Sequence, residues 1–575
     1  MNTVTNLPYT RYPWKKVTNV ANPETLNITF DKDRGYLNEE NGASNWKISG
    51  GLLSTDAKDC ENLAYIHVFE KNASANVRVR INDTYESASF SLLMRYNCED
   101  AFVKLVYDDR STHWYILGRE GADFPLVRYR AEYDYIPQNY CDKYKKLETG
   151  KWYDIGFTVD GDRGIITVDG EELLTVDAIS HISPGRIGIS AKNMNVDIES
   201  FDLTLLSGQG TVWKNVKHTK LPDERYREGG SVFEMKDGTL VYTHHSQVSF
   251  ESKDNGSTWE RREHWTDTHG YVNILRLKNG DFMKMIYRRE EDGKTYVMSQ
   301  TSSDDGATWI DGGKLLETPW HGNTTAYAGN MNDKITQISS GRVFYGMNYE
   351  VRDKSHPVDG RIVFCEFYYS DDNGATWTKS ETDSWELPGN EGQVWFGECK
   401  ILECDDGTLR MYNSWNNHGC VVYSESHDCG VTWGALTPIP ELVCARSSMQ
   451  FVKDTYADNE TTYYMVWVYS EPYSLNNPMT RSRLSLAKST DGKNWAFLGD
   501  LWRWEHSYMA GGSHIAHVVD AFIKTTKDYV ICGAGYSEKL EVPEASDNTY
   551  HHAQRQHVYS IPKSSLVPVP LKPVN

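Results

Sequence analysis

The stretch Ser302–Ile310 reads SSDDGATWI, and near-copies of it recur along the chain. The other copies are SKDNGSTW (Ser252–Trp259), SDDNGATW (Ser370–Trp377), SHDCGVTW (Ser426–Trp433) and the shorter STDGKNW (Ser489–Trp495). In each copy the Ser and Asp side chains can bond backbone groups of their own turn, and the Gly can adopt a positive φ. We therefore predict a structural turn between two strands, with its Trp packed between repeat units, rather than an active site.

A hairpin pattern precedes each of these turns. Clear versions are FEMKDGTLVY (Phe233–Tyr242), LRLKNGDFMKMIY (Leu275–Tyr287), TQISSGRVFYGMNY (Thr336–Tyr349) and KILECDDGTLRMY (Lys400–Tyr412), and looser ones occupy Phe451–Tyr469 and Asp520–Tyr536. Successive turns begin 50, 68, 56 and 63 residues apart, a spacing that indicates a propeller or another repeat array. Four strands per unit and six units predict a six-bladed β-propeller over residues 208–575.

Residues 1–207 contain no copy of the turn and show a different pattern. Short stretches with alternating apolar residues follow one another, as in Ser87–Tyr96 and Ala101–Asp109, and Asp160-Gly161 indicates a hairpin turn. Many antiparallel strands without a helical period predict a β-sandwich of the jelly-roll kind. The chain is thus expected to be all-β, with two domains.

Composition limits the partners of this chain. The net charge is −20 and no stretch is basic, which argues against nucleic acid as a partner. No apolar run reaches the roughly 18 residues of a membrane span. The first residues, MNTVTNLPYTRYPWKK, lack the apolar segment of a secretory signal, so we expect a cytoplasmic protein or a secreted one whose signal has been removed. Abundant Tyr and Trp suit sugar binding as well as β-cores.

The ten cysteines show no spacing typical of a zinc site, so we expect mostly free, buried thiols. The His-rich stretch TYHHAQRQHVY (Thr549–Tyr559) is expected to form a surface loop and the closing strand rather than a metal site. No metal and no cofactor are predicted.

The repeated turn is similar to the Asp-box, and five copies preceded by hairpins resemble the sialidase (neuraminidase) superfamily of six-bladed BNR-repeat propellers over about residues 215–565. The N-terminal region resembles concanavalin-like or laminin-G-like domains, through the WYDIGF…VDG hairpin (from Trp152) and the GRIGI strand (from Gly185). Members of that group are often carbohydrate-binding modules. The resemblance implies a glycan as the partner and chemistry at one mouth of the propeller's central tunnel.

The sialidase pattern can be followed residue by residue. GECKILECDDGTL (Gly397–Leu409) resembles the strand that carries the family's catalytic Glu, which implies that role for Glu398. Counting back from the fifth turn places Arg481 at one arginine of the family's carboxylate-binding triad, and the stretch containing Arg446 resembles the strand that opens the same blade.

Other positions depart from this pattern. Glu228 stands where blade one should carry a triad arginine, Trp415 ends the Asn-Ser-Trp that replaces Asn-Ala-Arg, and His514 lies near the expected catalytic Tyr. Because an arginine clamp is what holds an anionic sugar, and a Glu in its place repels a carboxylate, ordinary sialic acid is not the expected substrate.

A propeller brings side chains from every blade to a shared rim, so distant residues can converge. The catalytic candidates are Glu398, Glu228, His245 and His514, and the substrate-binding candidates are Arg481, Arg446, Trp415, Arg288 and Tyr536. Glu228 and Glu398 are the preferred carboxylate pair, which could act as acid and base or as acid and nucleophile.

Three functions stay open from the sequence. The first is an exo-acting glycoside hydrolase that removes a terminal sugar from a glycan. The second is a polysaccharide lyase acting on a uronate-containing glycan, since His or Tyr can serve as its base. The third is a carbohydrate-binding propeller without catalysis. The sugar, the linkage and the stereochemical outcome are not indicated.

Overall fold

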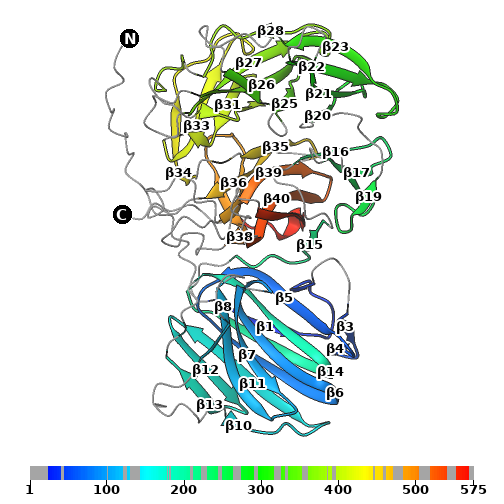
Figure 1. The fold of residues 1–575 in the computed structure, drawn as a ribbon, viewed down its shortest axis with the longest axis vertical. Coiled ribbons are helices and arrows are strands. Elements are labelled where there is room, and N and C mark those ends of the chain that lie inside the picture. The colour runs from blue at the N-terminus through cyan, green and yellow to red at the C-terminus, as the bar shows by residue number, and fades with distance from the viewer. Residues whose placement is uncertain are drawn as a thin grey trace, which may run out of the picture.

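The computed structural model describes residues 24–39, 45–99, 101–120, 126–129, 143–177, 179, 183–207, 211–221, 230–243, 249–262, 273–289, 295–315, 326–329, 334–352, 361–384, 386–390, 396–416, 418–444, 447, 449–456, 461–469, 483–503, 518–540 and 552–568. Nearly all regular structure in these residues is β-strand, with a short 3-10 helix at Lys563–Ser565. Two units are visible, one blue to teal and one green to red (Figure 1). Within the described residues, no helix is long and apolar enough to cross a membrane.

The N-terminal unit is a single system of hydrogen-bonded strands. The strands are β1 Glu24–Thr29, β2 Leu37–Asn38, β3 Lys47–Ser49, β4 Leu52–Asp56, β5 Glu61–Glu70, β6 Ala73–Cys98, β7 Ala101–Asp108, β8 His113–Glu120, β9 Val127–Tyr129, β10 Lys143–Tyr144, β11 Trp152–Asp160, β12 Arg163–Val168, β13 Glu171–Val176 and β14 Gly185–Leu205. The long strands β6 and β14 pair with each other through several bulges, which let a strand bend. Alternate apolar residues such as Val77, Val79 and Ile81 point into one core. This agrees with the predicted all-β N-terminal unit.

The C-terminal unit consists of six blades, as predicted. Blade one is β16 Ser231–Glu234, β17 Leu240–Thr243, β18 Ser249–Ser252 and β19 Glu260–Arg262; blade two is β20 Asn273–Arg276, β21 Phe282–Arg289, β22 Thr295–Ser302 and β23 Ile310–Leu315; blade three is β24 Ala326–Gly329, β25 Ile335–Gln337, β26 Val343–Arg352, β27 Arg361–Ser370 and β28 Thr378–Lys379; blade four is β29 Phe396–Gly397, β30 Lys400–Glu403, β31 Leu409–Asn413, β32 Trp415–Asn416, β33 Cys420–Ser426 and β34 Thr437–Val443; blade five is β35 Gln450–Asp454, β36 Thr462–Tyr469, β37 Arg483–Ser489 and β38 Ala496–Arg503; blade six is β39 Val518–Thr525, β40 Tyr529–Leu540, β41 His552–Pro562 and β15 Lys217–Lys220. The inner strands β16, β20, β25, β30, β35 and β39 each contact the next, and β39 contacts β16, so the ring is closed.

Blade six takes its outer strand from the other end of the propeller sequence. Strand β15 precedes blade one and pairs antiparallel with β41, from Lys217 opposite Ser560 to Lys220 opposite His557. The His-rich stretch therefore supplies the closing strand, as predicted, but the contribution of β15 was not foreseen.

The repeated turn is a structural device, as its sequence indicates. In one copy, Asp372 accepts hydrogen bonds from Ser370 Oγ (2.7 Å), Thr376 N (2.8 Å) and Thr376 Oγ1 (2.6 Å), while Ser370 Oγ accepts from Gly374 N (2.7 Å). The same set recurs in the copies that begin at residues 252, 302 and 426. In the shorter copy, Asn494 replaces the Thr.

These turns also join neighbouring blades. Serine hydroxyls of one blade donate to carbonyl oxygens in the turn of the next, in the pairs Ser299–Gly374 (2.5 Å), Ser380–Gly430 (2.6 Å) and Ser560–Asn255 (2.6 Å). Tyr412 of blade four bonds the Gly492 carbonyl in the turn of blade five in the same way. These four turns thus fix the spacing between their own blade and the preceding one.

The two units meet at a buried aromatic contact. His67 of β5 stacks on Trp213, with ring centroids 5.0 Å apart and planes 5° apart, and its Nε2 lies 3.1 Å from the Asp500 carbonyl oxygen of blade five. Trp213 Nε1 donates to the Leu498 carbonyl (3.0 Å). Burial lowers the pKa of His67 from 6.5 to about 3, so this ring is neutral near pH 7.

A second histidine bridges the units beside it. His218 of β15 lies 2.9 Å from the Tyr65 hydroxyl of the N-terminal unit through Nδ1 and 2.9 Å from His557 Nδ1 of blade six through Nε2. Burial, followed by the neighbouring His557 and Arg186, lowers the pKa of His218 well below its usual 6.5. The closely packed rings of His67 and His218, both with lowered pKa, therefore join the N-terminal unit to the propeller.

The cysteines behave as predicted. All nine in the described residues are free thiols, and only Cys60 and Cys429 among them are exposed.

Candidate functional site

The strongest predicted site residue, Glu398, lies at the start of blade four, between β29 and β30. Its backbone is left-handed (φ 59°), which is uncommon for a residue with a Cβ atom, and the residue is only 5% exposed. This conformation lies at the point where the chain passes from one strand pair to another: β29 before Glu398 pairs with β32, and β30 after it pairs with β31. Non-glycine residues held in this region persist where surrounding contacts fix them, and they cluster at functional sites.

Side chains of two blades fix the backbone of Gly397 and Glu398, and both that bond Glu398 come from blade three. The Glu398 N donates to Asn348 Oδ1 (2.7 Å), and the Glu398 carbonyl oxygen accepts from Lys334 Nζ (3.0 Å). On the same strand segment, the Gly397 carbonyl accepts from Asn413 Nδ2. The carboxyl-bearing residue is therefore positioned by blade three as well as by its own blade.

Lys334 brings a buried positive charge to this network. It is 2% exposed, and its backbone N donates to Asn273 Oδ1 of blade two. Burial lowers the pKa of Lys334, whereas the charge of Glu398 acts in the opposite direction and favours the ammonium form. The charge of Lys334 and the position of Glu398 are therefore expected to depend on each other.

Blade five approaches the same region through Ser447. Its carbonyl oxygen accepts from Ser414 Oγ (2.5 Å), and Ser414 lies between β31 and β32, close to Glu398 in the blade. Ser447 is 2% exposed, and its own Oγ has no hydrogen-bond partner in the described part of the chain. Buried polar atoms are normally satisfied, so this hydroxyl is a group that a ligand or water can bind.

The backbone of Trp415 is near Glu398, as the sequence suggested. Strand β32 sets Trp415 opposite Gly397, the residue before Glu398. The other predicted residues at this rim, namely Glu228, His245, His514, Arg446 and Arg481, lie outside the described residues. Their roles stay predictions.

Tyr536 requires a correction. It is 1% exposed and stacks on Trp502 of blade five, with ring centroids 4.6 Å apart, inside the core between blades five and six. Its ring is covered by Trp502 and His557, so it cannot contact a sugar.

Arg288 also requires a correction. Its guanidinium bonds both carboxylate oxygens of Asp311, at 2.5 and 3.0 Å, and Asp311 lies on β23, the outermost strand of blade two. Arg288 therefore points away from the propeller axis, where it cannot help bind a ligand at the tunnel mouth.

Sequence reasoning missed Lys334, Asn348, Asn273 and Asn413. A signal for two of them was present, since Asn273 and Lys334 each stand seven residues before the glycine of their hairpin, Gly280 and Gly341. Polar residues at that fixed position stand where the inner strands begin. Among the described residues, no group of three or more His, Cys, Asp or Glu could hold a metal ion.

Comparison with known proteins agrees with the repeat architecture of the C-terminal unit. Residues 281–518 match the family model described as a BNR repeat-like domain. The C-terminal unit is a sialidase-like BNR-repeat propeller. A sialidase from Clostridium perfringens is 22% identical over 280 residues, which cover 43% of this chain and 68% of that protein.

Solved sialidase structures resemble the chain more widely, at low identity. Hadza microbial sialidase Hz136 is 12% identical, with a TM-score of 0.46 and coverage of 89% of this chain and 98% of that one. The NanB sialidase from Streptococcus pneumoniae is also 12% identical, with a TM-score of 0.41 and coverage of 86% and 96%. At this distance a sialidase-like propeller does not carry a particular substrate with it.

Proposed function

We propose that this protein is a glycoside hydrolase that removes a terminal sugar from a glycan, with Glu398 as an essential carboxyl group. The observation that supports this is the fixed, left-handed backbone of Glu398, held by Asn348 and Lys334 from the neighbouring blade. Other residues with positive φ lie in the structural turns, such as Asn255 and Asn373, so the support comes from the two side chains of blade three that hold Glu398, because a reacting carboxyl group gains from fixed positioning.

The chemistry needs two carboxyl groups in this proposal. The glycosidic C–O bond breaks, the leaving oxygen takes a proton from one carboxyl group, and a water oxygen bonds to the anomeric carbon. The proton of that water passes to a carboxylate, or the second carboxylate first bonds the sugar and water then releases it. Glu398 is one member of this pair, and Glu228 at the start of blade one is the proposed partner.

We further propose that the terminal sugar is not an ordinary sialic acid. Glu228, Trp415 and His514 replace residues that the sialidase pattern uses to hold or attack that sugar. A carboxylate at the position of a clamping arginine repels an anionic substrate. The N-terminal sandwich is proposed to bind the glycan chain.

The test is turnover of a panel of umbelliferyl glycosides by the full chain. The panel contains neutral sugars, uronates and a sialoside. We expect a neutral sugar to be released and the variant Glu398→Gln to lose about 10²- to 10⁴-fold in kcat, the range for loss of a general acid or base. Unfolding followed by circular dichroism should give the same midpoint for both proteins.

Glu441→Gln is the matched control, because Glu441 belongs to the same blade but lies on its outermost strand, β34. It should keep full activity. Full activity of Glu398→Gln would remove Glu398 from the mechanism, and turnover of the sialoside alone would overturn the substrate proposal. Release of a product with the ultraviolet absorbance of an unsaturated uronate would show a lyase instead.

A further inference from the structure

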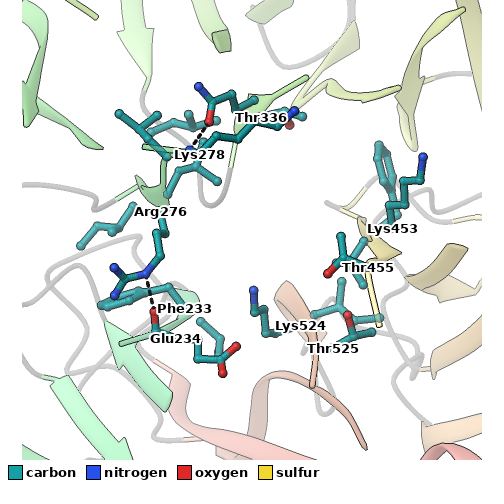
Figure 2. Close-up of a pocket in the computed structure, with 18 of the residues that line it drawn as sticks. Phe233, Glu234, Arg276, Lys278, Thr336, Lys453, Thr455, Lys524 and Thr525 are labelled. Carbon is teal, nitrogen blue, oxygen red and sulfur yellow. Dashed lines mark hydrogen bonds between the residues drawn. The ribbon is translucent and has the colours of Figure 1, made fainter. Parts of the chain in front are cut away.

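The contact between the two units is made by buried histidines and lies apart from the pocket on the propeller axis. That pocket, of about 820 Å³, is lined by the six inner strands, from Val232 to Thr525, and its described lining residues all belong to the propeller (Figure 2). His67 and His218 instead lie where β5 of the N-terminal unit meets β15, β38 and β41, and each is 1% exposed. A change in their charge therefore acts on the contact between the units.

The surroundings of His67 favour its neutral form. Its Nε2 lies 3.1 Å from the Asp500 carbonyl oxygen, which only accepts, so Nε2 carries the hydrogen. Its Nδ1 is buried and has no hydrogen-bond partner in the described part of the chain. A second proton would go to Nδ1 and create a buried, charged N–H without an acceptor, which costs free energy.

The surroundings of His218 also fix one hydrogen. Its Nδ1 lies 3.5 Å from Arg186 Nη1, which only donates, so Nδ1 is an acceptor and also accepts from the Tyr65 hydroxyl (2.9 Å). The hydrogen of the neutral ring is therefore on Nε2, which donates to His557 Nδ1 (2.9 Å). A second proton on His218 would go to Nδ1 and place an N–H against the Arg186 guanidinium.

The charged and titratable groups around the two rings do not compensate an added proton. Besides the rings themselves, these groups are Tyr65 of β5, Arg186 of β14, Lys220 of β15, Asp500 of β38, and His557 and Tyr559 of β41. The carboxylate of this set, Asp500, already accepts from Arg483 Nε and Ser485 Oγ, both at 2.7 Å. Arg186 is 1% exposed and lies 4.2 Å from the centroid of the Tyr65 ring. Protonating either histidine therefore adds a positive charge near one that is already buried.

We propose that this contact is an acid-sensitive switch, which holds the N-terminal unit on the propeller at neutral pH and releases it when His67 and His218 are protonated. In the released state both rings reach water and take up a second proton without these costs. Burial is the largest cause that lowers the pKa of His67 from 6.5 to about 3 and the pKa of His218 well below 6.5. Because the pKa in the contact lies below the pKa in water, the contact has its full strength above about pH 6.5 and weakens as the pH falls.

The size of the effect follows from this linkage. Below pH 6.5 each histidine weakens the contact by about tenfold per pH unit, until the pH reaches its pKa in the contact. At pH 5 the loss is about 30-fold for His67 alone and up to about 1,000-fold for both rings. Trp213 supplies a part of the contact that does not titrate, since its Nε1 donates to the Leu498 carbonyl (3.0 Å) and a Cβ atom at Gly499 would lie 2.5 Å from its Cζ2. The pH dependence therefore comes from the histidines.

The experiment is small-angle X-ray scattering of the full chain between pH 8 and 4.5, with far-UV circular dichroism of the same samples. We expect the radius of gyration to rise below about pH 6 while the strand signal is kept, because the released units move apart without unfolding. His67→Phe keeps an aromatic ring against Trp213, and His218→Phe keeps the stack on Tyr559. Each variant should reduce the steepness of the transition from about two protons to about one. Steepness is the readout because each variant also loses a hydrogen bond, which moves the midpoint.

His427→Phe is the control, because His427 is an exposed histidine in the repeated turn of blade four. It should keep the transition of the wild type. A radius of gyration that stays constant between pH 8 and 4.5 would overturn the proposal. Expansion together with loss of the strand signal would also overturn it, by showing unfolding in place of release, and so would equal steepness in the wild type and both variants. The outcome does not depend on whether the propeller hydrolyses a glycoside.

Discussion

The two ends of the propeller are made by the same strands in different ways. At the rear, where the inner strands turn into hairpins, the repeated Ser-Asp-Gly-Thr-Trp turns use the same set of hydrogen bonds, and four of the turns accept a hydrogen bond from the preceding blade. At the front, where the inner strands begin, an Asn of one blade accepts a hydrogen bond from the backbone N of the next, in the pairs Asn273–Lys334 and Asn348–Glu398, and Lys334 Nζ adds a bond to the Glu398 carbonyl oxygen. The comparison shows that contacts between blades recur at both ends, and that at Glu398 a buried ammonium is added to them.

The largest expected effect is on the free energy of unfolding, from a variant in one of the repeated turns at the rear of the propeller. Gly374 has φ +87°, and a Cβ atom there would lie 2.6 Å from Met283 Cε and 3.1 Å from Ser299 Cβ. Gly374→Val therefore combines a left-handed valine with a clash between blades two and three, and should lower the free energy of unfolding by about 3 kcal/mol or more. Urea unfolding followed by tryptophan fluorescence measures it.

The control is Gly341→Val. Gly341 has a similar φ of +95° but open space around its Cβ position. Gly341→Val should lower the free energy of unfolding only by the cost of a left-handed backbone at valine, about 1–2 kcal/mol. Equal costs for the two variants would show that the contact between blades contributes nothing.

The next effect is on kcat, from a variant of Lys334, which holds Glu398 at the front of the propeller. Lys334→Met removes the ammonium that bonds the Glu398 carbonyl while keeping the length of the side chain. If Glu398 reacts as proposed, its displacement should lower kcat by about 100-fold, or about 2.7 kcal/mol of barrier, with little change in KM. Steady-state kinetics on the released glycoside measures the split between kcat and KM. A kcat equal to wild type would mean that Lys334 serves only to fill the hub.

The smallest effect is a pH-dependent loss of stability, from a variant of Asp491 in the shorter copy of the repeated turn. Burial disfavours the charge of Asp491, but hydrogen bonds from Asn494, Lys493 and Ser489 outweigh it and lower the pKa from 3.8 to about 2. Because the folded pKa lies below the unfolded one, this stabilisation is complete above about pH 4 and is lost as the pH falls toward 2. Asp491→Ala should cost about 1 kcal/mol at pH 7 and almost nothing near pH 2.

Asp528→Ala is the comparison for that variant, since Asp528 is an exposed residue at the hairpin tip of blade six. It should be nearly neutral at both pH values. A cost for Asp491→Ala that does not change between pH 7 and 2 would contradict a role for its charged form.

The sequence predicted those features that depend on residues close together along the chain, and missed those that depend on packing between blades. The turns were predictable because every bond within them joins residues at most four positions apart, as between Asp372 and Thr376. The place of Glu398 at the start of blade four was predictable because its hairpin resembles a known family strand, and its role stays a proposal. Lys334 was not, because a lysine at the start of an apolar strand usually indicates an exposed edge, and its burial beside Glu398 depends on how two blades pack.

The two corrected residues fail for the same physical reason. Tyr536 and Arg288 both stand on second strands of their hairpins, where sequence alone does not show to which side the chain points. Burial against Trp502 fixes the first, and the ion pair with Asp311 fixes the second. Orientation within a strand was decided by neighbours from other strands or another blade.

The pairing of β15 with β41 imposes an order on biogenesis. Strand β15 leaves the ribosome just after the sandwich, which can already hold it through the contact between Tyr65 and His218. Domains generally fold as units and N-terminal first during synthesis. The folded N-terminal unit therefore holds β15 with an unpaired edge before any of the six hairpins of the propeller has been translated. The last hairpin to be translated contains β41, the strand that pairs with β15. A nascent chain released before β41 has an open ring, and the unpaired edge of β15 is exposed to pairing with other chains.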